Sequence, residues 1–173
     1  VLADLGLQVP AVVFNRAGVY CPKRERLIEE RTLADRTIAR VLAFTAERDM
    51  PVVVMGAGAK WARHPKSEVE RQALRGLEDL TLVDEGELPV ERLIRITVFS
   101  DQYVDSGVLQ TELHDAVGQP VYYTNFPLNA LYEHVGSPYQ VVDVQPPCRG
   151  KGEALRFLEE HHGIPASAIV AVG

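Results

Sequence analysis

The stretch KGEALRFL at residues 151–158, followed by the apolar stretch IVAV at residues 169–172, is the most informative part of this sequence. Ala154, Leu155 and Leu158 follow the 3.6-residue period of a helix. The second stretch is apolar without alternation, which is typical of a strand that is buried on both faces of a parallel sheet. We therefore expect a helix and then a buried strand, as in an α/β layer.

Lys151 is the strongest candidate for catalytic chemistry. Its ammonium group belongs to the first turn of the expected helix, beside free backbone N–H groups and the positive end of the helix dipole, so its natural ligand is an anion such as phosphate. The alternative is a surface lysine without a role. The neighbouring Gly152 and the later pair Gly163-Ile164 favour the phosphate role.

These residues resemble the haloacid-dehalogenase superfamily of phosphohydrolases, in particular its Cof-type branch. There, a Lys-Gly-x-Ala-Leu helix, a Gly-Ile pair and an apolar strand ending in Val-Gly lead into an acidic loop that binds magnesium. Residues 5–20, LGLQVPAVVFNRAGVY, are similar to the family's Leu-Gly-Leu, proline, apolar strand, Asn-Gly-Ala and tyrosine segment. Two positions depart from the pattern, since Arg16 replaces a usual glycine and Gly150 a small polar residue.

The resemblance implies a magnesium-dependent phosphomonoester hydrolase that acts on small phosphorylated metabolites, sugar phosphates first, through an aspartyl-phosphate intermediate. It gives Lys151 the task of offsetting phosphoryl charge. Asn15 and Arg16 are implied as contacts near the phosphate. Asp143 matches an acidic residue in the last strand of the family's cap domain, near the substrate, and an exposed strand residue is the alternative. Mannosyl-3-phosphoglycerate phosphatase and sucrose-phosphatase are close alternatives of the same cap type.

The family's catalytic aspartates are absent between Val1 and Gly173 in this comparison. We therefore expect the 173 residues to be an internal piece of a longer protein, with the Mg²⁺ ligands outside this chain and no phosphatase activity in the piece alone. A small complete α+β domain is the structural alternative. A non-catalytic binding or assembly module is the functional alternative.

Composition and charge narrow the class of protein. Hydrophobic residues make up 46% and charged residues 24% of the sequence, enough apolar material for a core. The net charge of −6 argues against a general nucleic-acid or anionic-membrane surface. No apolar run approaches the roughly 20 residues of a membrane span. We expect a cytoplasmic protein with a small phosphorylated partner and an oligomeric state that the sequence leaves open. Cys21 and Cys148 are expected to be reduced, with a single disulfide between them as the alternative.

The order of expected elements places an α+β cap between two fragments of a core. Residues 1–22 and 146–173 are the core fragments, and residues 23–145 are the cap, in which helices cover a mostly antiparallel sheet. The fold class is therefore α/β, with the core Rossmann-like as the resemblance implies. The expected strands are 10–14, 19–21, 51–55, 80–83, 93–99, 120–124 and 139–144, and the expected cap helices are 35–48, 67–77, 106–117 and 128–134.

Local signals mark several helix ends. Thr32 or Asp35 can cap the first cap helix, and Ser67 with Glu70 forms a capping-box pattern. Asp105 or Ser106 opens the next helix, which stops at Gly118.

The stretch from residue 56 to residue 66 combines a glycine-rich turn with the one locally basic segment. It lacks the further motif residues of a nucleotide-binding loop, so a plain turn is expected at residues 56–60. A solvated loop is the first expectation for this basic segment, and contact of Lys60 and Arg63 with an anionic substrate that reaches the cap is the functional alternative, which makes both residues substrate-binding candidates. The pair His161-His162 is not expected to share a metal, because adjacent helix positions point about 100° apart.

Overall fold

The computed structural model describes residues 10–13, 17–84, 86–148 and 151–169. It divides into two compact units, Val1–Arg31 with Pro147–Gly173, and Thr32–Pro146. No helix in the described ranges is long and apolar enough to cross a membrane.

Among its described residues, the first unit contains a three-stranded antiparallel sheet and the α-helix α4 (Lys151–His162). The strands are β1 (Ala11–Val13), β2 (Gly18–Cys21) and β3 (Arg26–Glu30), in the order β1-β2-β3. Residues 23–31 were expected to belong to the cap, whereas the structure places them in the first unit. The chain reverses at Glu25, whose φ is 51°, and β3 pairs with β2. The division between the units therefore falls after β3 rather than at residue 22.

The core of the first unit joins segments from both ends of the chain. Val19 of β2 and Phe157 and Leu158 of α4 are buried together, and Val12, Ile164 and Ile169 pack against them. Leu155, which was expected on the apolar face, is exposed. It precedes Phe157 by two positions, about 200° around the helix, so it points away from the sheet. The rest of the expected strand 169–172 lies outside the described residues.

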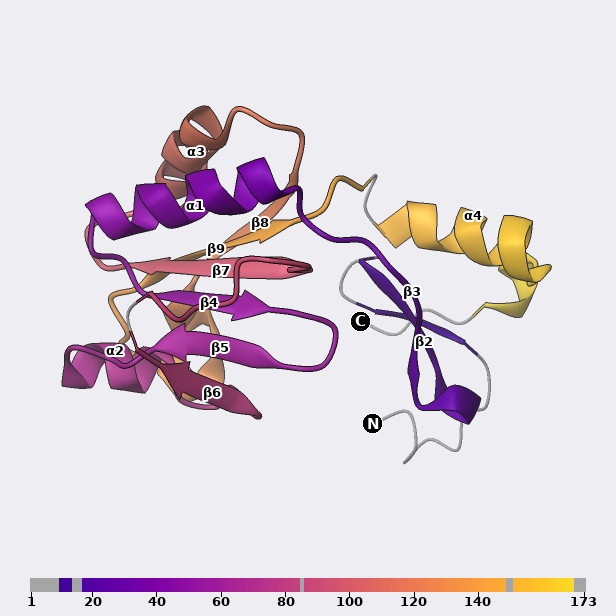
Figure 1. The fold of residues 1–173 in the computed structure, drawn as a ribbon, viewed down its shortest axis with the longest axis horizontal. Helices are drawn as coiled ribbons and strands as arrows, with labels where there is room; N and C mark the ends of the chain where they lie inside the picture. Colours follow the sequence, from indigo (N-terminus) through magenta and orange to yellow (C-terminus); the bar gives the residue numbers. More distant parts are fainter. Residues whose placement is uncertain (1–9, 14–16, 85, 149–150, 170–173) are drawn as a thin grey trace. The chain divides into compact units, whose positions relative to one another are not determined.

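The second unit is a six-stranded mixed sheet with three helices among the described residues, and it confirms the expected fold class. The strand order is β6-β5-β4-β7-β9-β8, with β5 and β6 parallel and every other neighbouring pair antiparallel. Figure 1 shows α1 and α3 next to each other at one side of this sheet. The strands are β4 (Val52–Met55), β5 (Lys60–Arg63), β6 (Leu80–Val83), β7 (Arg95–Ser100), β8 (Tyr122–Pro127) and β9 (Gln140–Gln145). The helices are α1 (Asp35–Glu47), α2 (Glu68–Ala73) and α3 (Ser106–Val117).

The main core of this unit lies between the sheet and the helices α1 and α3. Ile38 and Val41 of α1 and Leu109 and Leu113 of α3 are fully buried. They belong to one cluster with the sheet residues Val54, Ile96, Val98, Val142 and Val144. Alternate strand positions therefore face these helices, and the residues between them face the other side.

Helix ends follow the sequence signals in part. Asp105 Oδ1 accepts from Gly107 N at 2.8 Å and caps α3, and Gly118 ends that helix with φ 52°. Ser67 Oγ accepts from Glu70 N at 3.1 Å, but the Glu70 carboxylate accepts from Lys66 N, so the reciprocal half of the capping box is missing.

Two expectations about local structure are corrected. The N-cap of α1 is Ala34, which has no capping side chain, because the helix starts at Asp35 itself. The expected helix 128–134 is two 3₁₀ turns, Leu128–Ala130 and Tyr132–His134, because the backbone at Leu131 is extended.

Candidate functional site

Cross-strand register divides the sheet face opposite α1 and α3 into an apolar part and a polar part. Phe99, Val141 and Phe126 are paired across β7, β9 and β8, and the apolar part that they form packs with Ala73 and Leu74 at the end of α2. Farther along the strands the same face becomes polar. We call this part the polar half-face; its residues, paired in two rows, are Lys60, Met55 and Arg95, and Thr97, Asp143 and Thr124.

Asp143 of β9 lies at the centre of the polar half-face. Thr97 and Thr124 are its register partners on the two neighbouring strands, and all three side chains share one face. Thr97 Oγ1 donates to Asp143 Oδ1 at 2.6 Å, and Thr124 Oγ1 donates to Oδ2 at 3.4 Å. With its side chain only 12% exposed, the carboxylate is held in a fixed orientation.

Arg95, the first residue of β7, was not a sequence-based candidate. Its Nη1 lies 3.7 Å from Asp143 Oδ2, and its side chain is 24% exposed. The Nε atom is buried and has no hydrogen-bond partner among the described residues. The sequence does contain a signal for this position. Arg95 and Thr97 alternate with the buried residues Ile94, Ile96 and Val98, which is the pattern of a strand with one polar face.

Lys60 and Arg63 belong to β5, a strand that was expected to be a turn and a loop. Lys60 is paired with Met55, the residue that also pairs with Arg95, and its Nζ donates to the backbone oxygen of Glu78 at 2.9 Å. Arg63 is buried instead, and its two Nη groups donate to the Glu70 carboxylate, both at 3.1 Å. The structure therefore gives Arg63 an internal partner, whereas Lys60 stays within the polar half-face.

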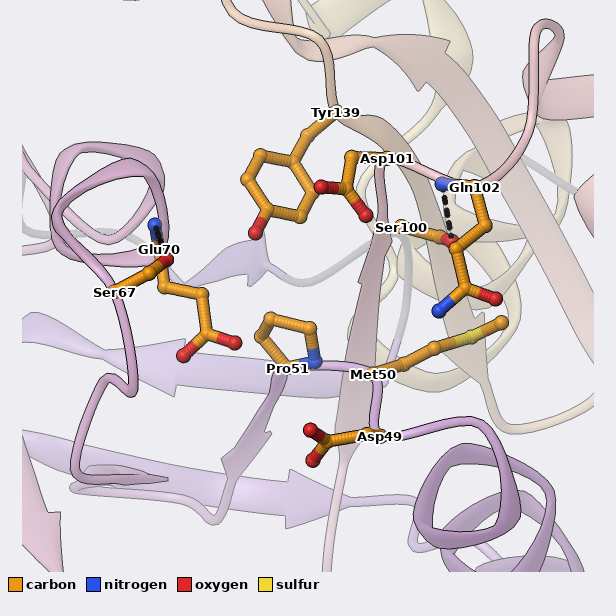
Figure 2. A pocket seen from close by; sticks show the side chains of 9 residues that line it. All are labelled: Asp49, Met50, Pro51, Ser67, Glu70, Ser100, Asp101, Gln102 and Tyr139. Atoms are coloured by element: carbon orange, nitrogen blue, oxygen red, sulfur yellow. Dashed lines mark hydrogen bonds between the residues drawn. The ribbon is translucent and has the colours of Figure 1, made fainter.

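A cavity of about 210 Å³ lies at the other end of β7 from Arg95. Figure 2 shows the Asp49, Glu70 and Asp101 side chains around it, together with the Tyr139 hydroxyl. Burial, followed by the nearby charges of Asp101 and Glu70, raises the pKa of Tyr139 to about 12. No lysine or arginine is among the described residues that line this cavity, whereas the polar half-face contains Lys60 and Arg95, so the polar half-face suits a phosphorylated substrate better.

Two carboxylates of this cavity already have cationic partners. Lys66 Nζ donates to Asp49 Oδ1 at 2.6 Å, and this hydrogen bond lowers the pKa of Asp49. Glu70 binds the buried Arg63. The carboxylates thus stabilise the loop before β4 and the start of α2.

In the first unit, the beginning of α4 is fixed by Arg31, which sequence reasoning did not single out. Arg31 Nη1 lies 2.9 Å from Glu153 Oε1 and 3.5 Å from the backbone oxygen of Pro147. Lys151 is the first residue of this helix. Its side chain and the candidates Asn15 and Arg16 lie outside what the structure describes.

The described residues do not fit a metal site. None of their histidine, cysteine and carboxylate side chains form a group of three that could hold an ion. His161 and His162 instead contact the ring of Phe157, with centroids 4.8 and 5.3 Å away. Cys21 and Cys148 are both free thiols.

Comparison with known families identifies the chain. The sequence profile of the haloacid dehalogenase-like hydrolases matches residues 1–173. The chain belongs to this family. The resemblance at residues 5–20 and 151–173 is thereby confirmed. Comparison with curated proteins finds no match.

Solved structures share the fold of this haloacid dehalogenase-like chain. A sugar phosphatase of HAD subclass IIB has a TM-score of 0.68 at 14% identity, over 94% of this chain and 56% of its own. A protein of Thermotoga maritima has a TM-score of 0.64 at 15% sequence identity, and the match covers 94% of this chain and 57% of that protein. A HAD-superfamily phosphatase of Bacteroides thetaiotaomicron has a TM-score of 0.64 at 14% sequence identity, and the match covers 92% of this chain and 54% of that protein. The chain therefore spans little more than half the length of these proteins.

Proposed function

We propose that this chain is part of a magnesium-dependent phosphomonoester hydrolase that acts on small phosphorylated metabolites, sugar phosphates first, through an aspartyl-phosphate intermediate. The observation that carries the proposal is the family match over residues 1–173, with Lys151 at the first position of α4. A solved structure of the same fold is called a sugar phosphatase, which supports the substrate class. The attacking aspartate and the Mg²⁺ ligands are assigned to residues outside this chain, and the protein to the cytoplasm.

The first unit supplies the phosphate-facing residues in this proposal. A twelve-residue helix carries free N–H groups in its first turn, where an anion is stabilised. Arg31 and Glu153 anchor this turn to the end of β3. Lys151 offsets the phosphoryl charge, and Asn15 and Arg16 contact the substrate near the phosphate.

The second unit acts as the cap and contacts the rest of the substrate. Asp143 accepts hydrogen bonds from substrate hydroxyl groups, because the two threonines occupy only part of the acceptor capacity of its carboxylate. Lys60 contributes positive charge to the same face. Arg63 is assigned to stability rather than to substrate, since Glu70 already holds its guanidinium.

The test is Lys151→Ala in the complete protein. Loss of one charge-stabilising donor costs on the order of 10²–10³ in turnover, and we expect a fall of this size in kcat for a sugar phosphate. The matched control is Lys23→Ala, which removes an exposed lysine from the same unit and should leave kcat unchanged. Wild-type kcat in the folded Lys151→Ala variant would remove this residue from the mechanism.

A further inference from the structure

Arg95 is a largely buried guanidinium without a hydrogen bond among the described residues. Within the part of the chain that the structure describes, its one ionic contact is to Asp143, with 3.7 Å between Nη1 and Oδ2. Charge-assisted N–H···O bonds are typically 2.7–2.9 Å long, so this contact is not one of them. Its Nε–H is buried and has no hydrogen-bond partner in the described ranges, an arrangement that native proteins rarely leave unexplained.

The register shows why Asp143 does not satisfy this guanidinium. Asp143 is paired with Thr97, whereas Arg95 is two residues earlier on β7 and faces Asp143 diagonally. Thr97 holds Oδ1 at 2.6 Å and so fixes the carboxylate away from Arg95. Arg95 is therefore held near Asp143, and this carboxylate does not take up its N–H donors.

The charges around Arg95 favour an anion. Lys60 and Arg95 both pair with Met55 and share a face, so their Cα atoms are about 10 Å apart at about 4.8 Å per strand. Asp143 is the one acidic side chain in the polar half-face. The sum of these three charges is one positive charge. Among the described residues, Oδ2 of Asp143 accepts one hydrogen bond, from Thr124 at 3.4 Å.

We propose that Arg95 is a specificity-determining residue that binds a second anionic group of the substrate, a carboxylate or a second phosphoryl group, while Asp143 accepts from a hydroxyl beside it. The planar guanidinium suits both anions, because each presents two oxygens to its fork of N–H donors. This inference rests on the proposed function and deepens it. It narrows the substrate class to phosphorylated hydroxy compounds with a further negative charge.

The experiment compares matched substrates with the complete protein. Gluconate 6-phosphate and glucitol 6-phosphate differ only in a terminal carboxylate, and fructose 1,6-bisphosphate and fructose 6-phosphate differ in a second phosphoryl group. We expect the wild type to favour the more anionic member of at least one pair in kcat/KM. Arg95→Met should lower that ratio about 10- to 100-fold, and Arg95→Lys should lower it less, because the charge remains without the fork.

The control is Arg71→Met, which removes an exposed arginine from α2 and should keep the wild-type ratio. A ratio that Arg95→Met leaves unchanged in both pairs would overturn the inference, as would a wild type without preference in either pair. If Arg95→Met does not fold, Arg95→Lys takes its place, and an unchanged ratio in that variant decides against the inference.

Failure of the proposed function gives a different result, namely no phosphate release from any of the four compounds by the wild type. Calorimetric titration with gluconate 6-phosphate then tests Arg95 directly. Binding that is about tenfold weaker in Arg95→Met than in the wild type supports the anion site, and equal or absent binding rejects it.

Discussion

Glu70→Gln should destabilise the second unit strongly, because it removes the charge that compensates a buried arginine. The side chains of Arg63 and Glu70 are only 9% and 10% exposed, and two 3.1 Å hydrogen bonds join them. Removal of one partner from a buried ion pair typically costs 3–5 kcal/mol. Asp49 Oδ1, 3.5 Å from Arg63 Nη2, compensates in part, so we expect about 3 kcal/mol, the lower end of this range.

The assay is urea unfolding followed by the fluorescence of Trp61. Trp61 is the single tryptophan of the chain and packs against the main core of the second unit, so it reports on that unit. The matched control is Glu68→Gln on the same helix. Glu68 is 59% exposed and pairs with Arg71 at the surface, so the cost should stay below about 1 kcal/mol.

A double substitution separates the charge effect from packing. Arg63→Met with Glu70→Leu leaves no buried charge, and apolar replacements of a buried pair are often neutral or stabilising. The double variant should therefore be more stable than Glu70→Gln. This order of the two free energies of unfolding would show that the effects of substituting Arg63 and Glu70 are coupled. Equal free energies of unfolding for Glu70→Gln and Glu68→Gln would refute the reasoning.

Two further predictions concern α3 and the buried tyrosines. Asp105→Ala removes the cap of α3 and should lower the free energy of unfolding by about 1 kcal/mol, measured by urea unfolding, with Asp115→Ala as the control outside the cap. Burial raises the pKa of Tyr123 and Tyr139 to about 12, so ultraviolet titration of tyrosinate should show both side chains ionising near pH 12. Because the folded state holds these protons more tightly, stability should fall as the pH rises from about 10 to about 12.

Elements with local signals were predictable from the sequence. The helix α3 begins after the capping Asp105 and ends at Gly118, and both signals act within one turn of the backbone they stabilise. The strands β3 and β5 were missed, because each carries charged residues and depends on pairing. β3 forms by pairing with β2. β5 contains two basic residues, and the charge of one of them, Arg63, is compensated by Glu70 only in the folded protein.

The candidate site was predictable only at single positions. Asp143 came from resemblance, but its partners Thr97 and Thr124 are 46 and 19 residues away, and only the register of β7, β9 and β8 brings them together. Arg95 belongs to no sequence motif. It stands out because its Nε–H is buried without a hydrogen-bond partner among the residues that the structure describes. Such a feature arises only when strand pairing brings residues from distant parts of the sequence together, so no short stretch of the sequence predicts it.

The contact between Arg31 and Pro147 has a consequence for folding. The chain leaves the first unit after Arg31 and returns to it at Pro147. The chain between them, residues 32–146, forms the second unit. An unfolded loop of that length would oppose their contact with an entropy that grows as (3/2)RT ln n, about 4 kcal/mol plus a constant for about 115 residues. Folding of the second unit replaces this flexible loop by one fixed end-to-end separation, which makes the stability of β3 and α4 depend on a sheet to which neither belongs.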